Sequence, residues 1–181
     1  MSATKAYILS TSKRRRNTRS MITSKDVYNI ANLLSDCVKK ESDSSVNAHS
    51  ESAYRSAISR YYYSAFLELR GILEYLISAD EVSKIKHAAM PEKLGKLKRL
   101  ANKNRNNVSP SDHSAVMNSL RELETIIDRS RRLRENCDYD ISRSLFATYT
   151  DAKSDLQNAK HWYTTVAYHR RIVESIMPRL I

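Results

Sequence analysis

Apolar side chains recur every three or four residues over two long stretches, and this spacing constrains the fold more than any other feature. In residues 51–78 the recurring positions are Tyr54, Ile58, Tyr61, Ala65, Leu69, Ile72 and Leu76. In residues 143–177 they are Leu145, Tyr149, Ala152, Leu156, Ala159, Tyr163 and Val166. Steps of three and four keep side chains on one face of an α-helix, whereas a half-buried strand alternates at every second residue. Both stretches are therefore predicted to be amphipathic helices.

Capping signals mark the start of three further helices. Thr23 followed by Asp26 has the form of a capping box, Pro91 suits a first helical turn, and Ser109 precedes Pro110. Apolar positions continue each helix, as at Val27, Ile30, Ala31, Leu34 and Val38, and later at Val116, Leu120, Leu123, Ile127 and Leu133. The predicted spans are about 23–41, 91–101 and 109–135, with connections at 42–50, 79–90, 102–108 and 136–142.

Glycine is scarce, which excludes several classes of fold and site. The chain of 181 residues has two glycines, Gly71 and Gly95, and three prolines. A glycine-rich phosphate loop, a dinucleotide-binding fingerprint and a turn-dense β-sandwich all need more glycine at positive φ. The prediction is an all-α protein, an antiparallel four- to five-helix bundle with short links. Residues 23–181 form the bundle, and residues 1–22 form a flexible basic arm without acidic residues.

The charge and the cysteine content indicate the partner and the compartment. Thirty-one lysines and arginines against 20 acids give a formal net charge of +11, which favours an anionic partner. Cys37 and Cys137 suit a reducing, cytoplasmic compartment and are too few for a zinc site. The histidines show no metal-ligand spacing, so neither a metal nor a cofactor is expected. No uncharged run approaches 18 residues, so no membrane span is expected.

Two segments together resemble a known family. The first is Ser52–Phe66, which contains Ser59-Arg-Tyr-Tyr-Tyr-Ser-Ala-Phe66, and the second is Leu133-Arg-Glu-Asn-Cys-Asp-Tyr-Asp140. They are similar to the HEPN superfamily, most closely to the subgroup with an SRxYYxAF helix and a later LRxxxDYD segment. His87 lies where that subgroup often has a histidine. The resemblance implies a helical bundle that often dimerises. Many HEPN proteins are metal-independent endoribonucleases of toxin–antitoxin and phage-defence systems, and others bind RNA, nucleotides or partner proteins.

The usual catalytic motif of the family is absent. It consists of arginine, four to six further residues and histidine, but the matching positions after Arg134 are Tyr139, Asp140 and Ile141. We therefore expect an RNA-binding or RNA-associated protein without standard HEPN catalysis. One alternative is an active metal-independent endoribonuclease that uses Arg134, Tyr139 and His87. Another is a protein-interaction subunit that binds an acidic partner. The family's gene settings add a nucleotidyltransferase, or another defence protein, as a candidate partner.

Eight residues are candidates for contact with nucleic acid. They are Arg60, Arg129, Arg131, Arg132, Arg134, Asp138, Lys96 and Arg99. Arginine offers a planar fork for phosphate oxygens, and a carboxylate at i+4 holds that fork in place. The competing interpretations stay open: Arg134 and Asp138 as a structural ion pair with Tyr139 in the core, and the other basic residues as solvated helix faces. Tyr61, Tyr62 and Tyr63 occupy most of a helix circumference, so one or two of them should face a cleft or a partner.

The last predicted helix is long enough to extend beyond its neighbours. Its final turns carry Trp162, Tyr163, Tyr168, Ile172, Val173 and Ile176. An overhang of this kind would expose apolar surface in a monomer. The prediction is a twofold dimer that buries part of this surface.

Overall fold

The computed structural model describes residues 22–39, 48–139 and 149–181, and side chains at 48–49 and 149–151 are not described. The described residues form α1 (Ser24–Lys39), α2 (Ala48–Arg70), α3 (Ala79–Ser83), α4 (Met90–Lys103), α5 (Pro110–Tyr139) and α6 (Tyr149–Leu180), with 3₁₀ turns η1 (Gly71–Tyr75), η2 (His87–Ala89) and η3 (Arg105–Asn107). Every regular element in these ranges is helical, so the all-α prediction is confirmed. The basic arm, apart from its last residue, lies outside the described residues.

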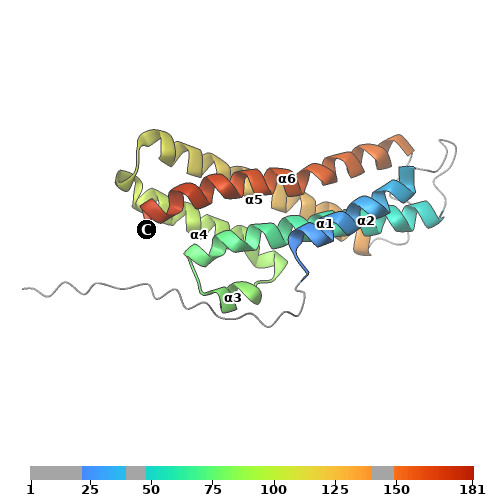
Figure 1. Ribbon diagram of the computed structural model, residues 1–181, viewed down its shortest axis with the longest axis horizontal. Coiled ribbons are helices and arrows are strands. Elements are labelled where there is room, and N and C mark those ends of the chain that lie inside the picture. Colours follow the sequence, from blue (N-terminus) through green and yellow to red (C-terminus); the bar gives the residue numbers. More distant parts are fainter. Residues whose placement is uncertain (1–21, 40–47, 140–148) are drawn as a thin grey trace, which may run out of the picture.

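Helices α1, α2, α5 and α6 run along the length of the molecule, and the short α3 lies to one side of them (Figure 1). Helix α2 is central, because it packs against α1, α5 and α6. Helix α4 packs against α5 and also contacts α6. Helices α1, α2, α5 and α6, taken in this order, alternate in direction, which gives the antiparallel bundle that the sequence predicts (Figure 1).

The core consists of two clusters that follow one another along the bundle. The larger cluster joins the second half of α2 to α4, α5 and the second half of α6. The smaller one joins α1 to the first half of α2, the first half of α6 and Cys137 at the end of α5. Trp162 packs against both clusters. The apolar spacing that predicted α2 explains why this helix contributes to both clusters. Its predicted apolar positions are all fully buried: Tyr54, Ile58, Tyr61, Ala65 and Leu69. The next one, Ile72 in η1, is fully buried as well.

Side-chain caps begin the helices where the sequence predicts them. The Thr23 amide donates to Asp26 Oδ2 at 2.8 Å, and the Asp26 amide donates to Thr23 Oγ1 at 3.2 Å. The Asp112 amide donates to Ser109 Oγ at 3.1 Å. Sequence analysis missed a further capping box, formed by Ser78 and Glu81. This box starts α3 inside the stretch that was predicted to be a plain connection.

Helix α5 continues to Tyr139, so the predicted break at residue 136 is wrong. Arg55 of α2 supplies the physical reason. Its Nη1 donates to the carbonyl oxygen of Cys137 at 3.0 Å and lies 3.5 Å from that of Asn136. The last carbonyls of a helix have no partner within the helix, so a donor from a neighbouring helix stabilises the final turn. Residues 140–142 of the predicted break lie outside the described residues.

Two other helix ends differ from the prediction. Helix α2 ends at Arg70 and tightens into η1, and a Cβ on Gly71 would lie 2.9 Å from Arg170 Nη2. Helix α6 runs through Pro178 to Leu180. Proline has no N–H to donate to the carbonyl four residues earlier, which is that of Glu174. The Tyr75 hydroxyl donates to this carbonyl at 3.4 Å and supplies a replacement.

The structure corrects two expectations about exposure. Ile30, assigned to the buried face of the first helix, is 45% exposed. Val173 and Ile176, assigned to an apolar overhang, are buried in the larger core cluster, because the second half of α6 packs against η1, α4 and α5. Of the six residues named for a dimer contact, only Tyr168 is exposed. The dimer stays a prediction, but without the overhang that motivated it.

Candidate functional site

Helix α5 carries one row of core-facing positions whose character changes along the helix. The row follows steps of four and three: Val116, Leu120, Leu123, Ile127, Ser130, Arg134 and Cys137. Its first four members are apolar and buried. Arg134 continues the same row, so its side chain enters the bundle and is only 14% exposed. An arginine in a core row needs polar partners nearby, because burying an unpaired charge is costly.

Four residues form what we call the Arg134 cluster: Arg134, Asp138, Tyr63 and Tyr139. Arg134 Nε lies 2.6 Å from Asp138 Oδ2, and Arg134 Nη2 donates to the Tyr63 hydroxyl at 3.3 Å. The guanidinium carbon lies 5.6 Å from the Tyr63 ring centre and 5.4 Å from that of Tyr139, both cation–π distances. Burial disfavours the charge on Arg134, but Asp138 and the two tyrosines outweigh it and raise the pKa of Arg134.

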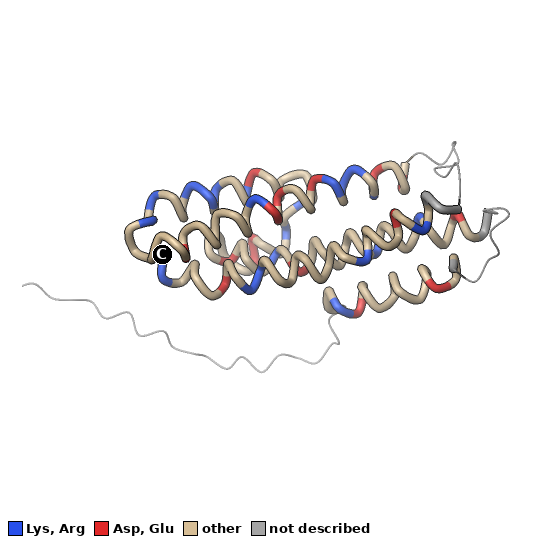
Figure 2. The backbone as a smooth tube through the Cα atoms, turned by 90° about the horizontal axis from the view of Figure 1, so that it is seen from above, with Lys and Arg blue, Asp and Glu red and all other residues tan. Residues whose placement is uncertain are grey.

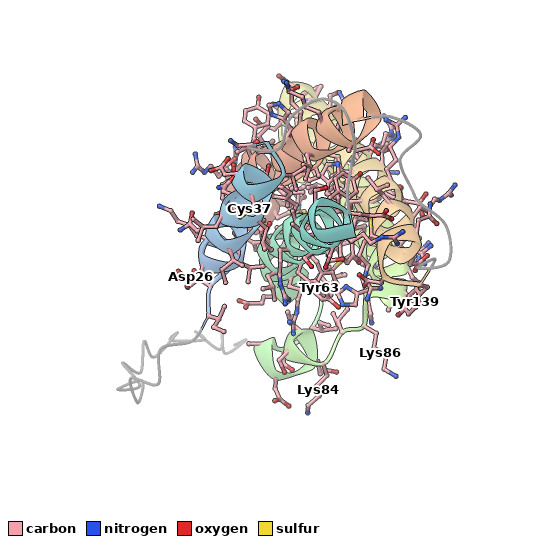
Figure 3. The ribbon with its side chains drawn as sticks, turned by 90° about the vertical axis from the view of Figure 1, so that its right-hand side faces the viewer. Asp26, Cys37, Tyr63, Lys84, Lys86 and Tyr139 are labelled. Atoms are coloured by element: carbon pink, nitrogen blue, oxygen red, sulfur yellow. The ribbon has the colours of Figure 1, made fainter. Side chains whose placement is uncertain are left out.

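The two tyrosines of this cluster differ in exposure. Tyr63 is half-buried on α2, whereas Tyr139 is 73% exposed. Figure 3 looks along the bundle and shows Tyr63 and Tyr139 on the side where Lys86 projects. The alternative that Tyr139 packs as a core aromatic is therefore wrong, while the ion pair between Arg134 and Asp138 is present. Tyr61 and Tyr62 are fully buried, so Tyr63 is the one of the three consecutive tyrosines that faces a cleft, as expected.

His87 approaches the cluster from η2. Its Nδ1 lies 2.9 Å from the Tyr62 hydroxyl, and its ring centre lies 5.0 Å from that of Tyr63 and 4.0 Å from that of Phe66. Burial is the main cause that lowers the pKa of His87, and the charges of Arg134 and Arg70 lower it further. Burial also raises the pKa of Tyr62. At neutral pH the pair is an uncharged imidazole hydrogen-bonded to an uncharged phenol.

A cleft of about 260 Å³ opens between α2 and the end of α5. We call it the Arg60 cleft, and its lining residues are Arg55, Ser56, Ser59, Arg60, Tyr63 and Asp138. Arg60 is exposed at this cleft, and no hydrogen bond or ion pair joins it to another described residue. Asp138 forms the opposite wall, where it accepts a short hydrogen bond from the Ser59 hydroxyl. An exposed guanidinium and a hydrogen-bonded carboxylate thus share a small cleft with serine hydroxyls and the paired Arg55.

Arg55 is a lining residue that sequence analysis missed. It is 9% exposed and pairs with Glu51, with Nη2 2.6 Å from Glu51 Oε1. Its contacts with the last carbonyls of α5 hold the end of α5 against α2, and so hold Asp138 opposite Arg60. The spacing of Arg55, Ser59 and Tyr63 by four residues was the available signal, since it places all three on one side of α2.

The predicted basic clusters are largely neutralised by neighbouring acids. Arg131 Nη1 lies 2.9 Å from Glu135, and Arg132 Nη2 lies 2.8 Å from Asp128. Lys96 lies 2.8 Å from Glu92. Arg129 and Arg99 are exposed and have no ion pair with another described residue. Figure 2 shows positive and negative residues interspersed along the helices rather than gathered in one stripe.

The structure brings some of the candidate residues together and separates others. Arg60 and Asp138 line the Arg60 cleft, Arg134 and His87 contact Tyr63, and Tyr139 contacts Arg134. Lys96 and Arg99 lie on α4, which meets α5 where Lys98 pairs with Glu124. Ten residues, or about 15 Å of helix, separate Glu124 from Arg134. Lys96 and Arg99 are therefore not part of the Arg60 cleft.

Two classes of site are not seen in the described part of the chain. None of its helices is long and apolar enough to cross a membrane. No three potential metal ligands come together there either. The Arg60 cleft offers guanidinium and hydroxyl donors, one carboxylate and one aromatic ring.

Comparison with known proteins identifies a relative. No family model matches the chain, and no solved structure gives a significant match. The chain is 30% identical over 133 residues to the uncharacterized protein MJ0992 of Methanocaldococcus jannaschii, a match that covers 66% of this chain and 67% of that protein. An identity of this level over two thirds of both proteins indicates common descent. The chain therefore belongs to the protein family of MJ0992.

Proposed function

We propose that this protein is a HEPN-like protein that binds single-stranded RNA in the Arg60 cleft and acts in a toxin–antitoxin or phage-defence setting. The observation that carries the proposal is Arg60, an exposed arginine that forms no hydrogen bond or ion pair with another described residue, at a cleft lined by serine hydroxyls and by Tyr63. An arginine guanidinium can bind a phosphate through two parallel N–H···O hydrogen bonds. The exposed ring of Tyr139, adjacent to Asp138, offers a surface on which an unpaired base can stack.

Arg60 is a better candidate for the phosphate contact than Arg134. Arg134 is held by Asp138 and Tyr63 and is largely buried, so a phosphate would have to replace existing partners. Arg60 would lose only water. Arg129 of α5 is exposed and has no ion pair with another described residue, so it adds long-range attraction.

Fluorescence anisotropy with a labelled 12-nucleotide RNA in EDTA tests this proposal. We expect Arg60→Ala to weaken binding by about tenfold or more, since a charge-assisted contact is worth roughly 1.5–3 kcal/mol. The dependence of binding on salt should also become shallower. Arg121→Ala is the matched control, because Arg121 is exposed on α5 away from the cleft and bonds to Asn118. Equal losses in the two variants would contradict the proposal and indicate only diffuse attraction.

A second candidate function is metal-independent RNA cleavage. It is favoured by His87, whose lowered pKa leaves a neutral imidazole beside Tyr63 and Arg134. Such an imidazole is able to accept a proton from a ribose hydroxyl. Cleavage of RNA in excess EDTA that is lost in His87→Gln would establish this function. RNA that is bound but not cleaved would contradict this second function and support RNA binding only.

The remaining alternative is a protein-interaction subunit with an acidic partner, such as a nucleotidyltransferase or another defence protein. A salt-sensitive gel shift with RNA separates RNA binding from this alternative. The twofold dimer also remains a proposal, and light scattering at micromolar concentration tests it, since a monomer mass would contradict it.

A further inference from the structure

We propose that the Arg60 cleft distinguishes ribose from deoxyribose, and that Asp138 does so by accepting a hydrogen bond from a 2′-hydroxyl. This inference rests on the proposed function, RNA binding in the same cleft. It assigns a role to the carboxylate in the cleft wall, which phosphate binding alone does not explain. A carboxylate repels phosphate, so a ligand whose phosphate lies at Arg60 fits this cleft better when it also places a hydrogen-bond donor at Asp138.

Asp138 is held in one orientation from two sides. Arg134 Nε lies 2.6 Å from Oδ2, and the Ser59 hydroxyl donates to Oδ1. These contacts come from α5 itself and from α2, so the carboxylate is fixed relative to both walls of the cleft. A group fixed in advance loses little conformational freedom when it binds a ligand.

The carboxylate still has room for a further donor. An ionised carboxylate offers about four lone-pair sites, and the contacts with Arg134 and Ser59 use two of them. The side chain is 27% exposed and lines the cleft. It accepts hydrogen bonds and donates none, so it matches a hydroxyl group and not a phosphate or a methyl ether oxygen.

The size and polarity of the cleft fit one sugar and its phosphate. Its volume of about 260 Å³ is below the roughly 300 Å³ at which pockets for drug-sized ligands begin. Arg60 and Asp138 come from different helices, α2 and α5. A phosphate at Arg60 and a ribose hydroxyl at Asp138 would use both charges. Deoxyribose would leave the remaining acceptor sites of the carboxylate without a donor from the ligand and close to a phosphate, which disfavours DNA.

Three labelled single strands of the same sequence test the inference with the unaltered protein. They are RNA, DNA and 2′-O-methyl RNA, each 12 nucleotides long, measured by anisotropy at one salt concentration in EDTA. We expect RNA to bind about tenfold or more tightly than DNA, the range of a hydrogen bond to a charged group. The 2′-O-methyl strand should bind like DNA, because its ether oxygen accepts hydrogen bonds but has no proton to donate.

Asp138→Asn tests which residue carries the selectivity. We expect the ratio of RNA to DNA affinity to fall to threefold or less, while DNA affinity stays equal or rises because a negative charge is gone. Glu135→Gln is the control, since it removes the same charge one turn earlier on α5, where Glu135 pairs with Arg131. It should keep the ratio of the unaltered protein. Circular dichroism melting checks that each variant is folded, and the three-strand comparison needs no variant.

Each outcome decides between the two proposals. Equal binding of all three strands by the unaltered protein overturns the ribose inference and leaves nucleic-acid binding in place. A ratio of RNA to DNA affinity in a folded Asp138→Asn protein that equals the ratio of the unaltered protein overturns the role of Asp138. Absence of binding to any strand overturns the proposed function, and the inference with it.

Discussion

The two halves of α5 use the same row of core-facing positions for different purposes. From Val116 to Ile127 the row is apolar and packs into the larger core cluster. From Ser130 to Cys137 it continues at the same spacing with a serine, an arginine and a cysteine. The first half contributes stability through burial, whereas the second half positions Asp138, Tyr63 and Tyr139 around a buried guanidinium. The comparison shows that one face of a helix can pack into the core along one half and hold a polar cluster along the other, while the spacing of its positions stays the same.

The largest expected effect comes from the apolar half. Leu123→Ala removes a fully buried side chain from the larger cluster. We expect it to lower the free energy of unfolding by about 2–5 kcal/mol, because it creates a cavity that the helices cannot close. Urea unfolding followed by circular dichroism measures this. Thr125→Ala, at an exposed position on the same helix, should change stability by less than about 0.5 kcal/mol. Similar losses in the two variants would contradict the division.

A smaller loss of stability is expected from the polar half. Arg134→Met keeps much of the apolar stem but leaves Asp138 with Ser59 alone. We expect a loss of about 1–2 kcal/mol, since the pair is partly solvent-exposed and Asp138 can gain water. A double-mutant cycle with Asp138→Asn measures the coupling between the two side chains. RNA affinity of the folded variant should fall less than in Arg60→Ala, and a greater fall would restore Arg134 as the phosphate contact.

The smallest expected effect is a dependence of stability on pH in the polar half. Burial, with Arg134 and Arg70, lowers the pKa of His87 below the usual value of 6.5. Below about pH 6.5 His87 therefore binds a proton more readily in the unfolded chain than in the folded protein. The free energy of unfolding falls as the pH falls. We expect the melting temperature to drop between pH 7 and pH 5.5, and the melting temperature of His87→Gln to drop less over the same range. Burial also lowers the pKa of His169, which contributes in the same direction. An equal drop in His87→Gln would show that other groups cause the dependence of stability on pH.

Much of the fold was predictable because it depends on local chemistry. The spacing of Tyr54, Ile58 and Tyr61 is enough to predict a helix and its buried face, and Thr23 and Ser109 are enough to locate helix starts. The end of α5 was not predictable in this way. Polar residues 136–139 resemble a loop, and they stay helical because Arg55, more than 80 residues earlier in the chain, donates to their carbonyls.

The candidate site was predicted in composition but not in its roles. The resemblance drew attention to Arg60, Arg134, Asp138 and Tyr139, and the described structure brings these residues around one cleft and one cluster. Whether Arg60 or Arg134 forms an ion pair was not predictable, because periodicity alone does not reveal whether a polar side chain has partners on a neighbouring helix. Arg55 was missed for the same reason, since its partners are carbonyls of another helix.

The sequence by itself determined that the chain is helical and which faces of its long helices are buried, because helix propensity, capping and apolar spacing act within a few neighbouring residues. Only the tertiary structure decided that Arg134 is paired and that Arg60 has no ion pair within the described residues, that Tyr139 is exposed and that Val173 is buried. Exposure and pairing depend on which helix lies opposite each side chain. That is set by the packing of α2 against α1, α5 and α6, and no local pattern encodes it.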